Sequence, residues 1–308
     1  MSAKQLKLIA VGLAILLLLW GGSELLSRGS DMVTGALHLP TLAEADVDAI
    51  MMAQGTDSIA LTRQSPAAWS VNGHRAAPAG VHDLLQALGD SVRPELVAQD
   101  ASSFARLHVD STGGRWLRLG RGGKPVLELI VGAHGNEPQS TYLRRPGDPH
   151  VYLWRGRLGS VVERSVDDWR DKRIAVLEPD SIVALDVARG TDRYTLKRAG
   201  KTWILPGGAA DSAAVARYLE RLKAINATGF ASSTDVAAGR AARPQRRLTV
   251  RGGRGVVLVS LAFDSSATGF VVRHVAGAGG EGATVYRMSF WEVDGVTPAS
   301  RSLVPAKK

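Results

Sequence analysis

Apolar positions along this chain follow two spacings, and the order of these spacings occurs twice. Alternating apolar and polar residues at 59–62 and 194–197 predict one strand in each half of the chain. A turn and a short tryptophan-containing strand come next in both halves. Apolar residues at i, i+3, i+4 and i+7 then predict an amphipathic helix, starting near Pro78 and Asp211, that packs on a sheet. The apolar positions of these two helices are Val81, Leu84, Leu85 and Leu88, and Val215, Tyr218, Leu219 and Leu222.

Further short apolar runs predict more strands after each helix. In the first half these strands are 107–109, 116–119, 126–131, 141–144 and 151–154. The second half has matching runs at 247–250, 256–262, 270–273 and 284–288, and a strand at 182–188 precedes its first hairpin. Leu158, Val161, Val162 and Trp169 predict an amphipathic linker helix between the halves. The predicted fold class is α+β, with two mostly antiparallel sheets that each pack one helix.

Equivalent landmarks in the two halves lie at one constant separation. Trp69 and Trp203 are 134 positions apart, and the same offset joins Val81 to Val215, Leu88 to Leu222 and 151–153 to 285–287. One offset at such separated landmarks indicates an internal duplication. We therefore expect an N-terminal segment, two tandem repeats, a connector and a tail, with the boundaries 1–28, 29–157, 158–178 (the helical connector), 179–300 and 301–308.

The N-terminal segment has the pattern of a membrane anchor. Lys4 and Lys7 precede an uncharged apolar run at 8–23, which Leu25 and Leu26 extend to about the length that a spanning helix needs. Lysines before the run predict a cytoplasmic N-terminus and an extracytoplasmic body after about residue 28. A cleaved signal peptide is the alternative, and it places the body on the same side. We expect a single-pass inner-membrane protein whose body lies in the periplasm.

Composition narrows the classes of function. The 308 residues are 45% hydrophobic and 22% charged, with a formal net charge of +9 and a pI of about 10.1. This charge favours anionic partners, and the expected location leaves no nucleic acid among them. There is no cysteine, which excludes disulfides, thiolate catalysis and cysteine-ligated iron–sulfur clusters.

One stretch carries the glycine pattern of a dinucleotide-binding loop. Gly277, Gly279 and Gly282 form G-x-G-x-x-G, but that motif needs a helix opening at its last glycine. Here ATVYRMSFW follows, which favours a strand, and the first repeat has RRPGDPH (144–150) at the same place. We interpret these glycines as a turn. GRGGKPV (120–126) and RGGRG (251–255) are interpreted as hairpin tips, the latter equivalent to STGGR (111–115).

No pattern of catalytic or metal-binding residues is present. The seven histidines include no pair at i+3 or i+4, and there is no G-x-S-x-G nucleophile elbow. His108 is expected within a strand. The carboxylates Asp167, Asp168, Asp171, Glu178 and Asp180 alternate with basic residues, which we interpret as a solvated, charge-balanced connector. We predict no catalytic, cofactor-binding or metal-ligating residue, no cofactor and no enzymatic activity.

Aromatic and basic residues leave two interpretations open. Trp69 and Trp203 recur at one repeat position, so core packing is favoured over a sugar-stacking platform. Residues 236–263 contain no acid and six arginines, which form either a solvated loop and hairpin or a face that contacts anionic lipid head groups. These arginines are Arg240, Arg243, Arg246, Arg247, Arg251 and Arg254.

Several short motifs resemble a known family. They are Trp69, Tyr142-Leu143-Arg144, Val151-Tyr152-Leu153, the connector Asp168-Trp169-Arg170-Asp171-Lys172-Arg173 and Thr202-Trp203-Ile204-Leu205. Together, over about residues 45–290, they resemble the bacterial membrane-anchored family catalogued as domain of unknown function 4340. The resemblance implies a protein encoded beside ABC transporter parts of the gliding-motility type, and it brings no catalytic residue.

Two functional hypotheses follow. The first is a non-enzymatic, membrane-anchored extracytoplasmic accessory protein that contacts an ABC-type transporter permease or another envelope complex. The second is an extracytoplasmic module that binds a polysaccharide, peptide or lipid in a groove between the repeats. An envelope hydrolase is a weaker third.

Overall fold

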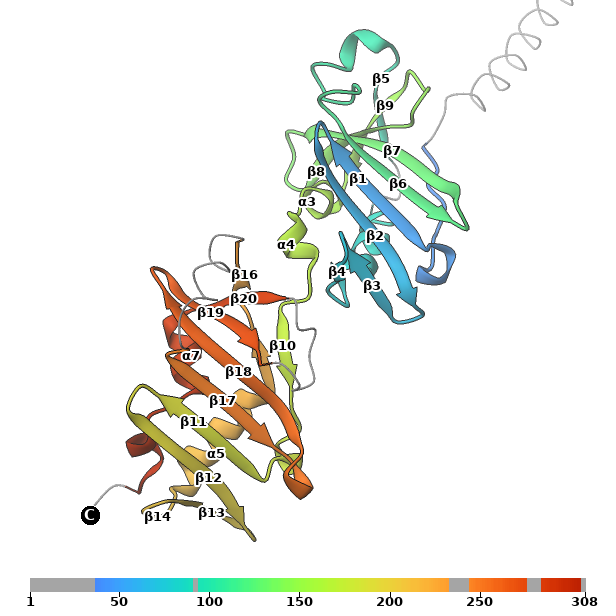
Figure 1. Ribbon diagram of the computed structural model, residues 1–308. Coiled ribbons are helices and arrows are strands. Elements are labelled where there is room, and N and C mark those ends of the chain that lie inside the picture. The colour runs from blue at the N-terminus through green and yellow to red at the C-terminus, as the bar shows by residue number, and fades with distance from the viewer. Residues whose placement is uncertain (1–36, 91–93, 233–243, 276–283, 306–308) are drawn as a thin grey trace, which may run out of the picture. The chain divides into compact units, whose positions relative to one another are not determined.

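Two long antiparallel sheets organise the chain (Figure 1). The computed structural model describes residues 37–90, 94–232, 244–275 and 284–305. The chain divides into two compact units: one runs to Asn72 and includes Pro78–Arg164, and the other comprises Gly73–Ala77 and Ser165–Lys308. The predicted α+β class with mostly antiparallel sheets is confirmed. Among the described residues no helix is long and apolar enough to cross a bilayer, and residues 8–26 lie outside them.

The described strands of the first sheet have the order β4-β3-β2-β1-β6-β7-β8-β9-β5. Their bounds are β1 Ala49–Gln54, β2 Asp57–Ser65, β3 Ala68–Val71, β4 His74–Arg75, β5 Glu95–Ala98, β6 Arg115–Arg121, β7 Lys124–His134, β8 Ser140–Arg144 and β9 Val151–Arg155. The accompanying helices are η1 Glu44–Asp46, α2 Gly80–Ala87, η2 Ala101–Ser103 and α3 Leu158–Val162.

The second sheet follows the order β14-β13-β12-β11-β17-β18-β19-β20-β16, and β10 pairs with β15 apart from it. The strand bounds are β10 Arg173–Val176, β11 Ala184–Arg189, β12 Asp192–Ala199, β13 Thr202–Leu205, β14 Gly208–Ala209, β15 Ala224–Asn226, β16 Gly229–Phe230, β17 Arg246–Arg251, β18 Val257–Ser266, β19 Gly269–His274 and β20 Val285–Met288. The helices are α4 Val166–Trp169, η3 Pro179–Ser181, α5 Ser212–Leu222, η4 Gly253–Gly255, α7 Phe290–Val296 and η5 Ser300–Leu303.

The two sheets have the same strand order and the same register. Ile50 pairs with Leu61 and with Leu119 in the first sheet, and Leu185 pairs with Leu196 and with Val250 in the second. All of these side chains are buried. Equivalent residues of the β1–β2 and β11–β12 hairpins are therefore 135 positions apart, whereas Trp69 and Trp203 are 134 positions apart. The difference of one comes from a β-bulge between Arg63 and Ser65 in β2, which β12 lacks.

The offset changes again along the sheet, and this corrects one predicted correspondence. β6 and β17 are 131 positions apart, because Ile50 and Leu185 pair with Leu119 and Val250. The turn from β17 to β18, which contains RGGRG (251–255), therefore matches the turn at 121–124 and not STGGR (111–115). Both turns are hairpin tips as predicted, with Gly122, Gly123 and Gly255 at positive φ.

The predicted helices lie where the apolar spacing placed them. Val81 and Leu84 of α2 are buried, as are Val215, Tyr218, Leu219 and Leu222 of α5. Asp211 caps α5, because its side chain accepts a hydrogen bond of 2.6 Å from the Ala214 amide. The tryptophans at the shared repeat position are 6% and 9% exposed, so core packing of Trp69 and Trp203 is confirmed. Figure 1 shows α5 behind the second sheet, whose near face it leaves open.

Other local predictions were wrong. Residues 107–109 form a turn and irregular backbone instead of a strand, and His108 has a φ of 53° there. Leu107 and Val109 pack instead with Ile130 and Val151 in a small second core on the open side of the first sheet. The predicted linker helix is two short helices, α3 and α4, because Ser165 interrupts it and caps α4 with Asp168. The strands β1 and β5 were not predicted.

Candidate binding surfaces

Each sheet has one face packed on the core with its helix and an opposite, open face. On the open face of the first sheet, side chains from β1, β2, β6 and β7 line a groove of about 330 Å³. We call this surface the apolar face; it consists of Ala49, Met51, Ala60, Thr62, Arg118, Gly120 and Glu128. Met51 is 47% exposed at its centre. Arg118 and Glu128 form an ion pair with each other, so Lys124 at the edge of the groove gives its described lining a surplus of one positive charge.

The equivalent face of the second sheet is charged. A depression of about 380 Å³ lies over β11, β12 and β17. We call this surface the basic face and define it by Asp186, Arg193, Thr195, Lys197, Arg247, Thr249 and Arg251. By register, Asp186 replaces Met51 and Thr195 replaces Ala60. Arg251 replaces Gly120, since these residues pair with Ala184 and Ala49.

Ion pairing leaves this second face with a positive surplus. Asp186 accepts from Arg251 at 2.7 Å and from the Thr195 hydroxyl at 2.8 Å. Arg193 and Arg247 are exposed at the rim of the same depression. Within the defined set, four cations therefore face one carboxylate, which makes the local electrostatic potential positive.

The six arginines that sequence analysis singled out do not form one surface. Arg247 and Arg251 lie on the basic face, and Arg254 is exposed at the β17–β18 hairpin tip. Arg246 points to the other side of β17 and is 14% exposed. Arg240 and Arg243 lie outside the described residues. Strand alternation separates Arg246 from Arg247, since successive side chains leave a strand on opposite faces.

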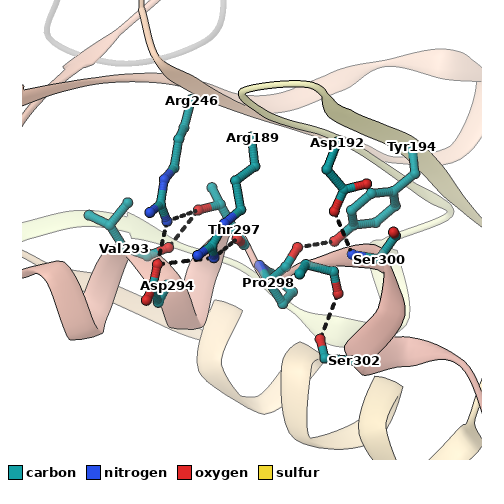
Figure 2. Close-up of polar contacts among 11 residues, drawn as sticks. Arg189, Asp192, Tyr194, Arg246, Val293, Asp294, Thr297, Pro298, Ser300 and Ser302 are labelled. Carbon is teal, nitrogen blue, oxygen red and sulfur yellow. Dashed lines mark hydrogen bonds and ion pairs between the residues drawn. The ribbon is translucent and has the colours of Figure 1, made fainter.

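Arg246 belongs to a polar cluster that fastens the C-terminal segment to the second sheet (Figure 2). It donates to the Thr297 hydroxyl at 3.1 Å and pairs with Asp294, which Arg189 also contacts at 3.0 Å. The Tyr194 hydroxyl donates to the Pro298 carbonyl at 2.7 Å, and the Ser300 amide donates to Asp192 at 2.8 Å.

The two tyrosines of this region support a structural role for the cluster. Burial raises the pKa of Tyr194, and it raises the pKa of Tyr218 well above the usual value of a phenol. Tyr218 donates to the Val296 carbonyl at 2.9 Å. Both phenols therefore stay protonated and donate to backbone carbonyls at the C-terminal end of α7: Tyr194 ties this end to β12 of the sheet, and Tyr218 ties it to α5.

The connector DWRDKR (168–173) combines solvated charges with packed residues. Four of the acids predicted to be solvated are exposed as expected: Asp167, Asp168, Glu178 and Asp180. Trp169 is fully buried, and its carbonyl accepts from the Ala77 amide at 2.7 Å. Arg170 lies 3.4 Å above the ring of Phe230. The Asp171 side chain is 3% exposed and pairs with Arg75 at 3.0 Å and Arg173 at 2.7 Å. The predicted solvated character is thus wrong for Asp171.

Hydrogen bonds set the charge state of this buried carboxylate. Burial alone would raise the pKa of Asp171, but the side-chain and backbone hydrogen bonds of Arg173 and the charge of Arg75 lower it below its ordinary value. Two other acids of the connector have local partners: Asp167 pairs with Arg170 at 3.1 Å and Asp168 with Lys172 at 3.2 Å. These contacts neutralise the connector without bringing two carboxylates into one cleft.

No catalytic or metal-binding constellation is found in the part of the chain that the structure describes. Within it, no group of three or more histidine, aspartate and glutamate side chains could hold a metal ion. His134 pairs with Glu163 at 3.0 Å, and His150 pairs with Asp148 at 2.6 Å. Each of these is a pair of partly exposed groups, a common surface contact.

The glycine pattern at 277–282 lies outside the described residues, but its flanks are described. It connects β19 to β20, which are adjacent antiparallel strands. A strand therefore follows the last glycine, where a dinucleotide-binding motif would place a helix. A helix does begin further on: Ser289 and Glu292 form a capping box for α7. The S-x-x-E spacing at 289–292 is the signal that could have predicted α7.

Comparison with protein families identifies the chain. The model of the family described as Domain of unknown function (DUF4340) matches residues 69–244, which is more than half of the sequence. The chain therefore belongs to this family, as its motifs suggested. Comparison with curated proteins and with solved structures gave no match. The motif positions Trp69, Leu143, Trp169 and Trp203 are all buried, so at these positions the shared motifs serve packing.

Proposed function

We propose that this chain is a non-enzymatic accessory protein of the bacterial cell envelope. A helix within residues 8–26 anchors it in the inner membrane, with the N-terminus in the cytoplasm. Two tandem repeats that arose by duplication then lie in the periplasm. There they contact an ABC-type transporter permease or another envelope protein, and they use no cofactor and bind no nucleic acid.

The observation that carries this proposal is the difference between the two open faces. A sheet face that is uncovered, positively charged and built on rigid strands is suited to binding an anionic partner surface. The same positions in the first sheet are largely apolar, and Arg118 among them is paired with Glu128. Two such faces on one chain favour a protein that joins components over one that performs a reaction. The membrane anchor is supported by the lysines and the apolar run of the N-terminal sequence.

In-cell crosslinking tests the proposal with a matched control inside the chain. A photoreactive residue replaces Thr195, at the centre of the basic face, or Ala60, at the equivalent position of the apolar face. After irradiation of intact cells, we expect the probe at 195 to capture an inner-membrane transporter subunit, identified by mass spectrometry. The same subunit should co-purify with the unmodified chain in detergent.

Other outcomes are equally informative. Failure of both probes to capture any envelope protein would refute the accessory role. Capture only from position 60 would move the partner to the apolar face. Arg193→Glu combined with Arg247→Glu should abolish capture from position 195, whereas Lys201→Glu at the exposed β12–β13 turn should not.

The apolar groove favours a second candidate function, the binding of a small ligand such as a peptide, a glycan fragment or a lipid. A space of about 330 Å³ is within the range of small-ligand pockets, and Met51 gives it an adaptable apolar floor. Native mass spectrometry of the purified chain would detect such a ligand. A Met51→Glu variant should release it, and a chain that carries no ligand in its purified form would argue against this candidate.

A further inference from the structure

One aromatic residue of the second unit is exposed to an unusual degree. Of the six tryptophans that the structure describes, Trp291 alone is more than half exposed, at 73%. Phe290 next to it is 49% exposed. Trp69, Trp154, Trp169 and Trp203 are all buried. Large adjacent aromatic side chains left in water mark a contact with another surface.

The fold holds these two rings in an outward position. Val293 and Val296 of α7 are buried in the core of the second unit, which fixes the rotation of this short helix. The Ser289 amide donates to the Glu292 carboxylate at 2.9 Å, so the start of the helix is fixed as well. Phe290 contacts Phe270 edge to face, with 5.5 Å between ring centroids. Trp291 therefore cannot turn into the core without unwinding α7.

Two arginines of α5 flank the exposed indole. The Arg221 guanidinium lies 5.4 Å from the Trp291 ring centroid. Arg217, one helical turn earlier, lines the same shallow groove of about 330 Å³ between α5 and α7. Gly295 makes room for this arrangement, because a Cβ atom there would approach Arg221 Nη1 to 2.8 Å.

The nearby acids are already engaged. Asp294 lines this groove but pairs with both Arg189 and Arg246. The Glu292 carboxylate accepts hydrogen bonds from the Ser289 amide and hydroxyl, each at 2.9 Å. The groove therefore has a positive surplus next to two exposed aromatic rings. We call Phe290, Trp291, Arg217 and Arg221 the aromatic–arginine patch.

We propose that the aromatic–arginine patch contacts the head-group region of an anionic lipid bilayer. Indole rings partition to membrane interfaces, because they are apolar with one polar N–H. Arginine stems lie along apolar surface while their guanidinium groups reach lipid phosphates. The rings protrude instead of lining an enclosed cavity, which fits insertion between lipids better than capture of a peptide. The biological setting rests on the proposed membrane location, but the test does not.

The test isolates Trp291 within the full-length chain. The chain is reconstituted into vesicles of phosphatidylcholine, alone or mixed with phosphatidylglycerol, whose acyl chains carry bromine. Bromine quenches indoles that it contacts, and subtracting the Trp291→Phe variant leaves the Trp291 signal alone. We expect quenching of Trp291 in the anionic vesicles and much less in phosphatidylcholine. Arg217→Ser and Arg221→Ser should each lower the ratio of contacting to free Trp291 about fivefold, whereas Lys201→Ser should not change it.

Each remaining outcome decides a separate question. Trp291 that is unquenched in both vesicles, or equally quenched in both, overturns the anionic-bilayer contact. Trp291 emission that responds to a soluble polyglutamate peptide but not to vesicles assigns the patch to an acidic protein segment and also overturns it. Flotation of the chain with the vesicles tests the anchor separately. A chain that floats only with anionic vesicles, and no longer does so as Trp291→Ala, would refute the anchor while supporting the patch.

Discussion

The two large sheets have the same order of described strands, yet their open faces differ in charge. On the side that packs against α2 or α5, equivalent positions hold buried apolar residues, such as Leu119 and Val250. On the open side the pairs differ: Met51 is matched by Asp186, and Gly120 by Arg251. A close-packed core restricts both halves in the same way, whereas an uncovered face tolerates any residue that the strand backbone accepts.

Equivalent described residues at the far end of the two open faces also have different partners. In the first unit, the segment around Leu107 crosses the sheet over Gly132, where the Ala133 amide donates to the Leu107 carbonyl at 3.0 Å. The equivalent of Gly132 in the second sheet is Asp264, which is 4% exposed and pairs with Arg273 at 3.2 Å. Arg144, the counterpart of Arg273, donates to the Val109 carbonyl at 2.9 Å. One arginine position therefore fastens a crossing segment in one half and neutralises a buried acid in the other.

The largest effect is expected where the halves agree most. Trp69→Ala and Trp203→Ala should each lower the free energy of unfolding of their own unit by about 3–5 kcal/mol, because both side chains are buried. Urea unfolding with hydrogen exchange localised to each unit measures this. Trp69→Phe should lower the free energy of unfolding more than Trp203→Phe does. The reason is that the Trp69 indole N–H donates a hydrogen bond of 2.8 Å to the Glu44 carboxylate. Equal losses for the two Phe variants would contradict that distinction.

Gly132→Ala tests the crossing segment of the first unit. A Cβ atom at this position would lie 2.4 Å from the Leu107 carbonyl oxygen, so the segment must move. We expect a loss of about 2–3 kcal/mol, confined to the first unit and accompanied by faster hydrogen exchange at 107–109. Gly207→Ala, where nothing lies near the added atom, is the control and should have little effect. Unchanged exchange at 107–109 would show that the crossing segment does not need this glycine.

Asp171→Asn tests the ion pairs that buried Asp171 of the connector makes with Arg75 and Arg173. We expect a loss of about 2 kcal/mol at neutral pH, less than for a fully buried pair because Arg75 and Arg173 are about half exposed. The folded-state pKa of Asp171 is lowered, so its stabilisation is present above the ordinary value of 3.8 and is lost as pH falls through the folded value. The free energy of unfolding, measured from pH 7 to below pH 3, should therefore fall less steeply in Asp171→Asn than in the unchanged chain. A parallel pH dependence would contradict the assignment.

The smallest effect on stability is expected on the basic face. Changing Arg193 and Arg247 to serine should alter the free energy of unfolding by no more than about 0.5 kcal/mol, because both side chains are exposed. The same change should weaken binding to an anionic partner or to phosphatidylglycerol vesicles, most clearly at low salt. A variant with serine at Lys201 and Lys223, two exposed residues outside the basic face, has the same net charge and tests whether position matters. Equal binding by both variants would show that binding depends on net charge and not on the position of the basic face.

Sequence patterns predicted the parts of this fold that one spacing dominates. The apolar stripes of α2 and α5 and the strands with clear alternation were placed correctly, because burial on one side imposes a period on the sequence. Leu107 and Val109 were assigned to a strand because they also alternate, yet they are buried by crossing another strand. β1 was missed because Met51 and Met52, which point to opposite faces of the strand, are both apolar. The alternation of apolar and polar residues is therefore absent from a strand that lines the apolar groove.

The candidate surfaces were less accessible to prediction. The cluster of arginines at 236–263 was evident, but strand alternation divides it, and only Arg247 and Arg251 join the basic face. Their neighbours there, Arg193 and Lys197, come from β12, which no linear pattern connects to β17. The capping box at 289–292 indicates that a helix begins there. The exposure of Trp291, however, depends on which face of α7 packs against the core.

The sequence by itself determined the mostly antiparallel α+β class, the two equivalent tryptophans, the helices that cover each sheet and membership of the family. These features depend on local periodicity and on short motifs, which are readable in linear order. Only the tertiary structure decided that Asp171 is buried, that Arg246 faces away from Arg247, and that one of two equivalent faces is largely apolar and the other basic. Such properties arise from contacts between segments that are distant along the chain, because the charge and burial of one residue depend on its neighbours in space.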